Sequence, residues 1–374
     1  MQNSVKFLLL TCSLLWGNTG WSQVDLKDTY GFEVQTSVDC TPVKSQDRTG
    51  TCWSYATSSF LESEVIRLGK GQHDFSEMYT VRNIYKDKAL NYLLRQGKAN
   101  FSQGSLAHDP IFIAQQLGIV PESVYSGLLE GAQKHDHGEM EAVLRGMLDG
   151  LLKRKQLSAN WKTAVEGVLD AYLGSAPETF VYQGQTYTPQ SFAASLGIVP
   201  DDYVQITSFT HRPFYRPFVL EIPDNYSNGL FYNVPLAEIE MIVDHALEKG
   251  YSVSWDGDVS EKGFSARNGI AVLPLDAERD DLFRQPGPER AVTQSSRQLD
   301  FESYATTDDH LMHLAGVAQD KTGTKYYLIK NSWGEISDYK GYLYMSQAYF
   351  QSKTVSVLLH KDAIPSEIAK KMNW

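Results

Sequence analysis

The stretch "TPVKSQDRTGTCWSYATSSFLE", Thr41–Glu62, places a cysteine directly before residues with the spacing of an amphipathic helix. The helix is predicted to begin at about Cys52 and to end at Gly69-Lys70-Gly71. A helix N-terminus offers unpaired N–H groups and the positive end of the dipole, which lower the pKa of a thiol and favour the reactive thiolate. Cys52 is therefore a candidate nucleophile, and the alternative is a buried structural thiol.

Residues far along the chain supply the other groups that a nucleophilic thiol needs. His310, in "TTDDHLMHLAGV", opens a predicted strand and can take a proton and return it to a leaving amine. Asn331, in "IKNSWG", follows the next strand and can hold the imidazole, while Trp333 shields that hydrogen bond from water. Gln46 can donate a side-chain N–H to an oxyanion. Cys52, His310 and Asn331 form a triad by role.

Three separated motifs carry a family resemblance. They are Gln46, Gly50, Cys52 and Trp53, then Asp309-His310, then Asn331-Ser332-Trp333-Gly334 with Gly341-Tyr342. In this order they resemble the papain-like cysteine peptidases. The resemblance implies Cys52 as nucleophile, His310 as general acid and base, Asn331 as the orienting residue and Gln46 in the oxyanion hole.

The chain departs from the papain pattern in two ways. Thr49 stands where the signature has its first cysteine, so the disulfide anchored there is absent. His310 lies 258 residues (310 − 52) after Cys52, against roughly 130 to 150 in papain itself. About a hundred extra residues are therefore inserted, and the Leu-, Ala-, Lys- and Glu-rich region after residue 130 supplies them.

The enlarged layout resembles the bleomycin hydrolase and aminopeptidase C subgroup, through stretches such as "LGIVPESVY", "DDYVQITSFTH" and "HKDAIPSEIAKKM". Members of that subgroup are generally cytosolic, often form homo-oligomers, and use a C-terminal tail to bind the substrate's amino group. Here the tail predicted after the last strand is short, ending in "KKMNW". We therefore expect a cleft open to endopeptidase action. The alternatives are a strict cysteine aminopeptidase, an acyl transferase and a catalytically silent peptidase-like binding protein.

The predicted fold class is α+β, a papain-like two-lobed architecture with an inserted helical region. A helical lobe over 23–130 carries the nucleophile, a mostly helical region covers 131–230, and a β-rich lobe over 231–374 carries His310 and Asn331. Residues 276–307 are polar and predict a long surface loop.

The N-terminal segment 1–22 has one positive charge, at Lys6, an apolar run from Phe7 to Trp16, and small or polar residues before Gln23. This pattern predicts a cleavable signal peptide and a secreted or periplasmic protein, with a lipid at Cys12 as the lesser alternative. A mostly apolar run of ten residues is too short to span a membrane. The net charge of −11, with no Lys/Arg block, argues against nucleic acid as a partner and leaves a peptide as the expected substrate.

A few other residues are candidates for functional roles. Gly104, in "FSQGSLAHD", together with Asp309 and Trp333, is a candidate for substrate binding. His135 and His137, in "KHDHGE", have metal-ligand spacing, but a solvated turn is the preferred interpretation. Neither H-E-x-x-H nor G-x-S-x-G occurs, so no metal site and no cofactor are predicted. His313 is expected to be a packing or surface residue, and Cys40 a free, packed thiol.

Overall fold

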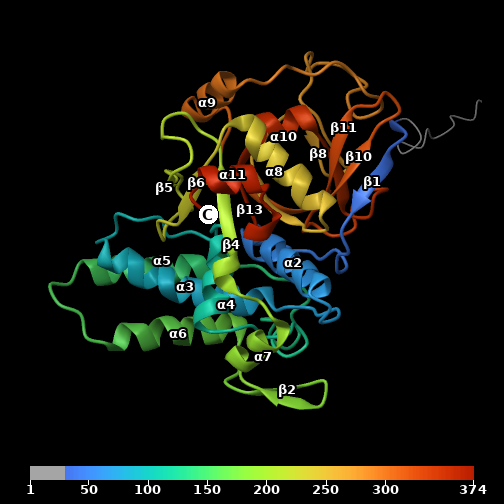
Figure 1. Ribbon diagram of the computed structural model, residues 1–374. Helices are drawn as coiled ribbons and strands as arrows, with labels where there is room; N and C mark the ends of the chain where they lie inside the picture. Colours follow the sequence, from blue (N-terminus) through green and yellow to red (C-terminus); the bar gives the residue numbers. More distant parts are fainter. Residues whose placement is uncertain (1–29) are drawn as a thin grey trace, which may run out of the picture.

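The structure is a computed structural model that describes residues 30–374. The segment 1–22, predicted as a signal peptide, lies outside the described residues. The described chain forms a helical part and a part built on a large sheet, which lie against each other (Figure 1). This is the two-lobed α+β arrangement expected from the sequence.

The helical part consists of α2 Cys52–Arg67, α3 Glu77–Leu94, α4 His108–Gln116, α5 Gly138–Leu152, α6 Asn160–Leu173 and α7 Pro189–Leu196, with the hairpin of β2 Phe180–Tyr182 and β3 Gln185–Tyr187. α3 begins where Ser76 Oγ accepts a hydrogen bond from the N–H of Tyr79, which is a typical N-cap. Apolar residues four positions apart give α5 and α6 one buried stripe each, formed by Met140, Leu144, Leu148, Val165, Leu169 and Leu173.

The second part is an eleven-stranded, mostly antiparallel sheet in the order β5-β6-β4-β13-β7-β10-β11-β12-β9-β8, with β1 paired to β10. The strands are β1 Glu33–Ser37, β4 Tyr203–Thr207, β5 Pro217–Val219, β6 Leu230–Asn233, β7 Val253–Gly257, β8 Phe264–Ser265, β9 Ile270–Ala271, β10 His310–Gln319, β11 Lys325–Lys330, β12 Tyr342–Ser346 and β13 Thr354–His360. The helices of this part are α8 Leu236–Glu248, α9 Gln294–Glu302, α10 Gln347–Lys353 and α11 Ser366–Lys371. Short 3₁₀ turns lie at Pro200–Asp202 and Lys361–Ala363.

The sheet register brings two predicted site residues to one edge. β10 begins at His310, which pairs with Gly257 at the end of β7. The antiparallel neighbour β11 ends at Lys330, so Asn331 follows at the same edge at which β10 begins. His310 and Asn331 are 21 positions apart in the sequence. They are adjacent in space because antiparallel β11 runs back to the end of the sheet at which β10 begins.

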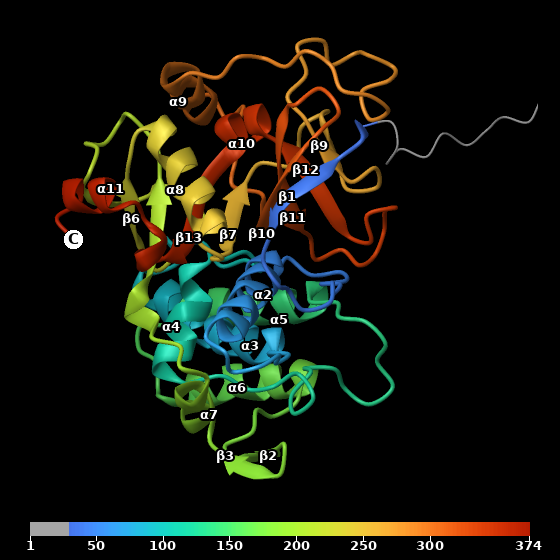
Figure 2. The ribbon, with the colours of Figure 1, turned by 45° about the vertical axis from the view of Figure 1, so that its right-hand side comes forward.

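Helix α2 joins the two parts, lying below β10 in Figure 2. It is buried along nearly its whole length, from Cys52 to Val65. Its residues share one apolar cluster with Leu311 of β10 and with Val355 and Leu358 of β13. A helix buried on all sides must sit inside the protein, and this burial fixes the N-terminus of α2 against the start of β10.

Two segments differ from the sequence expectation. The polar region 276–307 contains helix α9, whose N-cap Thr293 forms a reciprocal capping box with Ser296. The region 131–230 contains α5, α6 and α7, but its later residues form β4, β5 and β6, which join the large sheet. Strands of three to five residues give too short a pattern to be recognised by periodicity.

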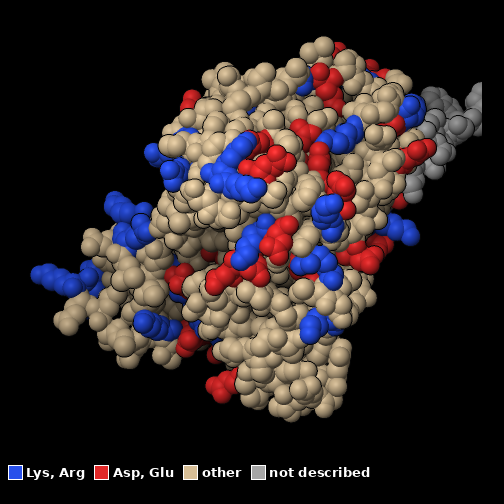
Figure 3. All heavy atoms as spheres, viewed as in Figure 1, with Lys and Arg blue, Asp and Glu red and all other residues tan. Residues whose placement is uncertain are grey.

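No helix in the described part of the chain combines the length and the apolar character that crossing a membrane requires. On the face shown in Figure 3, basic and acidic side chains are intermixed, so this face offers no continuous positive surface to a phosphate backbone.

Candidate active site

Cys52 is the first residue of α2 and its side chain is 8% exposed. The preceding Thr51 makes no side-chain capping bond, so no hydroxyl occupies this helix end. The backbone N–H of Leu311, the residue after His310, donates a hydrogen bond to the sulfur. The thiol of α2 is therefore held against the start of β10, where the predicted imidazole lies.

His310 and Asn331 are in direct contact. His310 Nε2 lies 2.8 Å from Asn331 Oδ1, which also accepts the backbone N–H of Ser332 at 2.7 Å. The ring of Trp333 stacks on the imidazole, with centroids 4.6 Å apart and planes at 30°. Because Nε2 donates to the amide oxygen, the neutral imidazole carries its proton there and leaves Nδ1 free to accept one. The predicted pairing and its cover by Trp333 are both present.

Gln46 is buried and rigidly held. Its Nε2 donates to the carbonyl of Thr49 at 2.6 Å, and its Oε1 accepts from Ser332 Oγ at 2.7 Å. Its backbone N–H donates to the Ser332 carbonyl at 2.8 Å. A carboxamide nitrogen has two hydrogens, so the second remains for an oxyanion. The contacts with Ser332 tie Gln46 to the strand end that carries Asn331.

Burial sets the protonation of the thiol and the imidazole. It raises the pKa of Cys52 to about 12, and the N–H of Leu311 opposes this rise only in part. It lowers the pKa of His310 to about 4, against a smaller raising effect of the bond to Asn331. Both groups are thus neutral at pH 7 in the free protein. The sequence-based expectation of a lowered Cys52 pKa is therefore not what the structure gives, because desolvation outweighs the helix N-terminus.

The remaining candidates for substrate binding have identifiable neighbours. The Asp309 carboxylate accepts from Thr307 Oγ1 at 2.7 Å and from the Val259 N–H at 3.4 Å. Gly104 lies against Asp224, because a Cβ on Gly104 would stand 1.9 Å from Asp224 Oδ2. The space beside Gly104 that the sequence suggested for a substrate is therefore occupied by the Asp224 carboxylate. That Gly104, Asp309 and Trp333 touch substrate stays a prediction.

Cys40 is a free thiol, as expected, and makes no disulfide with Cys52. Its Sγ lies 3.9 Å from Nδ1 of His313, which is fully buried and also 2.9 Å from Ser59 Oγ. His313 is thus a packing residue in a polar pocket behind α2. Nothing in this arrangement blocks the nucleophile.

The solvated turn expected at His135 and His137 is wrong, since the two side chains are only 7% and 2% exposed. The loop packs onto the helical part, where His137 lies beside Tyr85 with ring centroids 6.4 Å apart. Both ring nitrogens of His137 lack a hydrogen-bond partner, and burial lowers its pKa to about 4. Among residues 30–374 no group of three or more His, Cys, Asp or Glu side chains is arranged to hold a metal ion.

Sequence reasoning missed three carboxyl groups near the thiol. Asp308, Asp224 and Asp256 contribute, after burial, to the raised pKa of Cys52. They come from the residues before β10, the loop between β5 and β6, and β7. Only the "DDH" run at 308–310 was a signal for one of them. The other two are brought in by tertiary packing, which leaves no local pattern.

The comparisons with known proteins agree with this geometry. The model of the Peptidase C1-like family matches residues 171–374, which is more than half of the chain. The chain belongs to the Peptidase C1-like family. It is 23% identical to aminopeptidase G of Lactobacillus delbrueckii subsp. lactis, covering 85% of this chain and 80% of the relative. It is also 23% identical to aminopeptidase C of Listeria monocytogenes, covering 94% and 86%.

A crystal structure of PepW from Lactobacillus rhamnosis superposes with a TM-score of 0.70 at 20% identity, covering 91% of this chain and 84% of that one. The papain-like α+β fold, the resemblance to the aminopeptidase C and bleomycin hydrolase subgroup, and the assignment as a cysteine peptidase are therefore confirmed.

Proposed function

We propose that this peptidase is a thiol aminopeptidase in which Cys52 is the nucleophile, His310 the general acid and base, Asn331 the orienting residue and Gln46 an oxyanion donor. The observation that carries the proposal is the 2.8 Å contact of His310 Nε2 with Asn331 Oδ1 under the Trp333 ring. A silent binding protein has no physical need for this buried arrangement beside a free thiol at a helix N-terminus.

The reaction begins with transfer of the Cys52 proton to His310 Nδ1, since Nε2 is committed to Asn331. The sulfur attacks the scissile carbonyl carbon, and the developing oxyanion receives N–H bonds from Gln46 and from the Cys52 backbone. His310 then gives the proton to the leaving amine, which leaves a thioester on Cys52. Water, deprotonated by His310, hydrolyses the thioester and regenerates the thiol.

Two features bear on where the peptide is cut. The relatives compared above are named aminopeptidases, which favours removal of N-terminal residues. In favour of endopeptidase action, the segment that follows α11 packs on the sheet away from β10, with the Trp374 ring on Tyr232 of β6 at 4.4 Å between centroids. β6 and β10 are four strands apart in the sheet, which is on the order of 19 Å along it. Endopeptidase action is therefore the second candidate.

Matched fluorogenic peptides with free and acetylated N-termini separate the two candidates. The aminopeptidase proposal predicts that acetylation lowers kcat/KM at least a hundredfold. Equal rates for the two substrates would favour the endopeptidase. Loss of both activities in Cys52→Ala, with an unchanged unfolding transition, assigns the activity to this site.

Export of the protein and its assembly into a homo-oligomer are also proposals, which rest on the segment 1–22 and on the subgroup resemblance. N-terminal sequencing of the mature protein from its native host tests the first. Light scattering of the purified protein tests the second.

A further inference from the structure

A cavity of about 460 Å³ lies beside the candidate active site. One wall is the loop between β5 and β6, with Glu221 and Pro223, and the other runs from Phe301 of α9 through Tyr304 to Asp308. The loop also reaches the helical part, so the cavity lies where the two parts of the molecule meet.

The cavity adjoins the reacting groups from both walls. Asp308 lines it and stands two residues before His310. Pro223 lines it and precedes Asp224, whose carboxylate lies against Gly104. Asp308 and Asp224 both contribute, after burial, to the raised pKa of Cys52. A group bound in the cavity is therefore within electrostatic range of the nucleophile.

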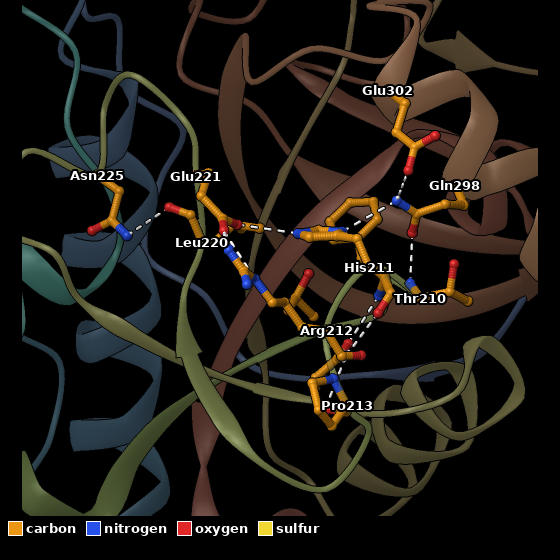
Figure 4. Close-up of polar contacts among 12 residues, drawn as sticks. Thr210, His211, Arg212, Pro213, Leu220, Glu221, Asn225, Gln298 and Glu302 are labelled. Atoms are coloured by element: carbon orange, nitrogen blue, oxygen red, sulfur yellow. Dashed lines mark hydrogen bonds and ion pairs between the residues drawn. The ribbon is translucent and has the colours of Figure 1, made fainter.

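The glutamates on the two walls of the cavity, Glu221 and Glu302, already have partners (Figure 4). Glu221 is engaged by the guanidinium of Arg212, at 2.9 Å from Nε, and by His211 Nε2 at 3.1 Å. Glu302 accepts from Gln298 Nε2 at 2.8 Å, and Gln298 also lies 3.1 Å from His211 Nδ1. Both glutamates therefore have hydrogen-bond partners already, and neither is free to bind a cationic group of a ligand.

The inner end of the cavity is different. Asp308 Oδ2 and Asp256 Oδ1 are buried and receive no hydrogen bond from any N–H or hydroxyl donor of the described residues. Asp256 is 1% exposed, and its other oxygen accepts from Ser356 Oγ at 3.0 Å. The two carboxyl groups hydrogen-bond to each other, and burial raises the pKa of both, to about 7 for Asp256, so the pair shares a proton in the free protein. Neither forms an ion pair with a Lys, Arg or His in the described part of the chain. The pair has no positive partner, and the shared proton takes the place of one.

We propose that Asp308, supported from behind by Asp256, receives the α-ammonium group of the substrate. The inference rests on the proposed aminopeptidase function and names the residues that select a free N-terminus. The ammonium supplies the missing counter-charge and the donors for the open carboxylate oxygens. The side chain of the first residue then lies toward the aromatic edge formed by Phe301 and Tyr304. The anchor is an internal pair of carboxyl groups, independent of the chain's C-terminus.

The test compares the wild type with Asp308→Asn on three substrates: a leucine coumarinyl amide, its N-acetyl form, and N-acetyl-arginine coumarinyl amide. We expect the wild type to prefer the free amine and Asp308→Asn to raise KM for it at least tenfold, so that the preference collapses. Because the wild-type pair shares a proton and Asp256 can ionise in the variant, the charge near Cys52 changes little, so alkylation of Cys52 by neutral iodoacetamide should stay within about twofold of wild type. A misfolded variant would instead expose the buried Cys52 and speed its alkylation.

Asp308→Glu keeps the charge and should retain a preference for the free amine, while Asp276→Asn removes an exposed carboxylate elsewhere and is the control for net charge. A wild type that cleaves free and acetylated leucine amides equally refutes the aminopeptidase proposal itself. A selective wild type with an equally selective Asp308→Asn overturns only the present inference. Loss confined to the acetyl-arginine substrate would assign the pocket to a basic side chain and would also overturn it.

Discussion

Replacing Asn331 by alanine removes the only acceptor described for His310 Nε2, at 2.8 Å. His310 is 3% exposed, so water has little access to the N–H that is left behind. A buried donor without a partner costs about 1–3 kcal/mol. Since about 1.4 kcal/mol corresponds to a tenfold change in rate, we expect Asn331→Ala to lower kcat/KM by about 5- to 150-fold. The loss should be mainly in kcat, because Asn331 orients the imidazole and does not bind the peptide.

The assay is steady-state hydrolysis of one peptide substrate, with urea unfolding measured in parallel. Asn331→Asp keeps an acceptor at the same position, so it should lose less activity than Asn331→Ala and should raise the His310 pKa through its negative charge. Asn160→Ala, at the exposed start of α6, is the matched control. Activity of Asn331→Ala within twofold of wild type would refute the orienting role. A loss explained entirely by unfolding would refute it as well.

Three further predictions concern thiol reactivity, acid stability and the glycine beside Asp224. Burial raises the Cys52 pKa to about 12, so the rate of alkylation by iodoacetamide should keep rising with pH through 9. A rate that reaches its plateau by pH 7 would show that His310 and the helix N-terminus outweigh burial. Burial lowers the His137 pKa from 6.5 to about 4, so its contribution to stability is present above pH 6.5 and is lost as the pH falls toward 4. By linkage this is at most about 3 kcal/mol, and urea unfolding of His137→Phe should depend less on pH in that window. An unchanged slope would argue against a neutral buried His137. Gly104→Ala forces Asp224 aside and should destabilise the protein by about 1–3 kcal/mol. The control Gly146→Ala, in α5 with open space around it, should be neutral or stabilising. Equal melting temperatures for the two variants would contradict the close approach of Asp224 to Gly104.

The sequence predicts the parts of the structure that have a strong local pattern. The start of α2 at Cys52, helix α8, and the strands β10 to β13 follow from periodicity and from glycine positions. The pairing of His310 with Asn331 follows from their places at a strand's start and at the next strand's end.

What the sequence does not predict depends on contacts between distant segments. The raised pKa of Cys52 results from burial against Leu311 and from carboxyl groups that arrive from β7 and from the β5–β6 loop. The burial of His137 results from packing on Tyr85. Hydrophobic periodicity carries no information on either, because both effects depend on tertiary packing between segments that are distant in the sequence.

The central claim is that Cys52 forms a covalent acyl-enzyme. The most direct measurement is mass spectrometry of the protein quenched in acid during turnover of a slowly hydrolysed leucine ester. The account predicts a mass increase of one leucyl group on the peptide that contains Cys52, with Cys40 unmodified and no increase in His310→Ala. Turnover with no adduct on Cys52, or an adduct on Cys40 alone, would contradict it.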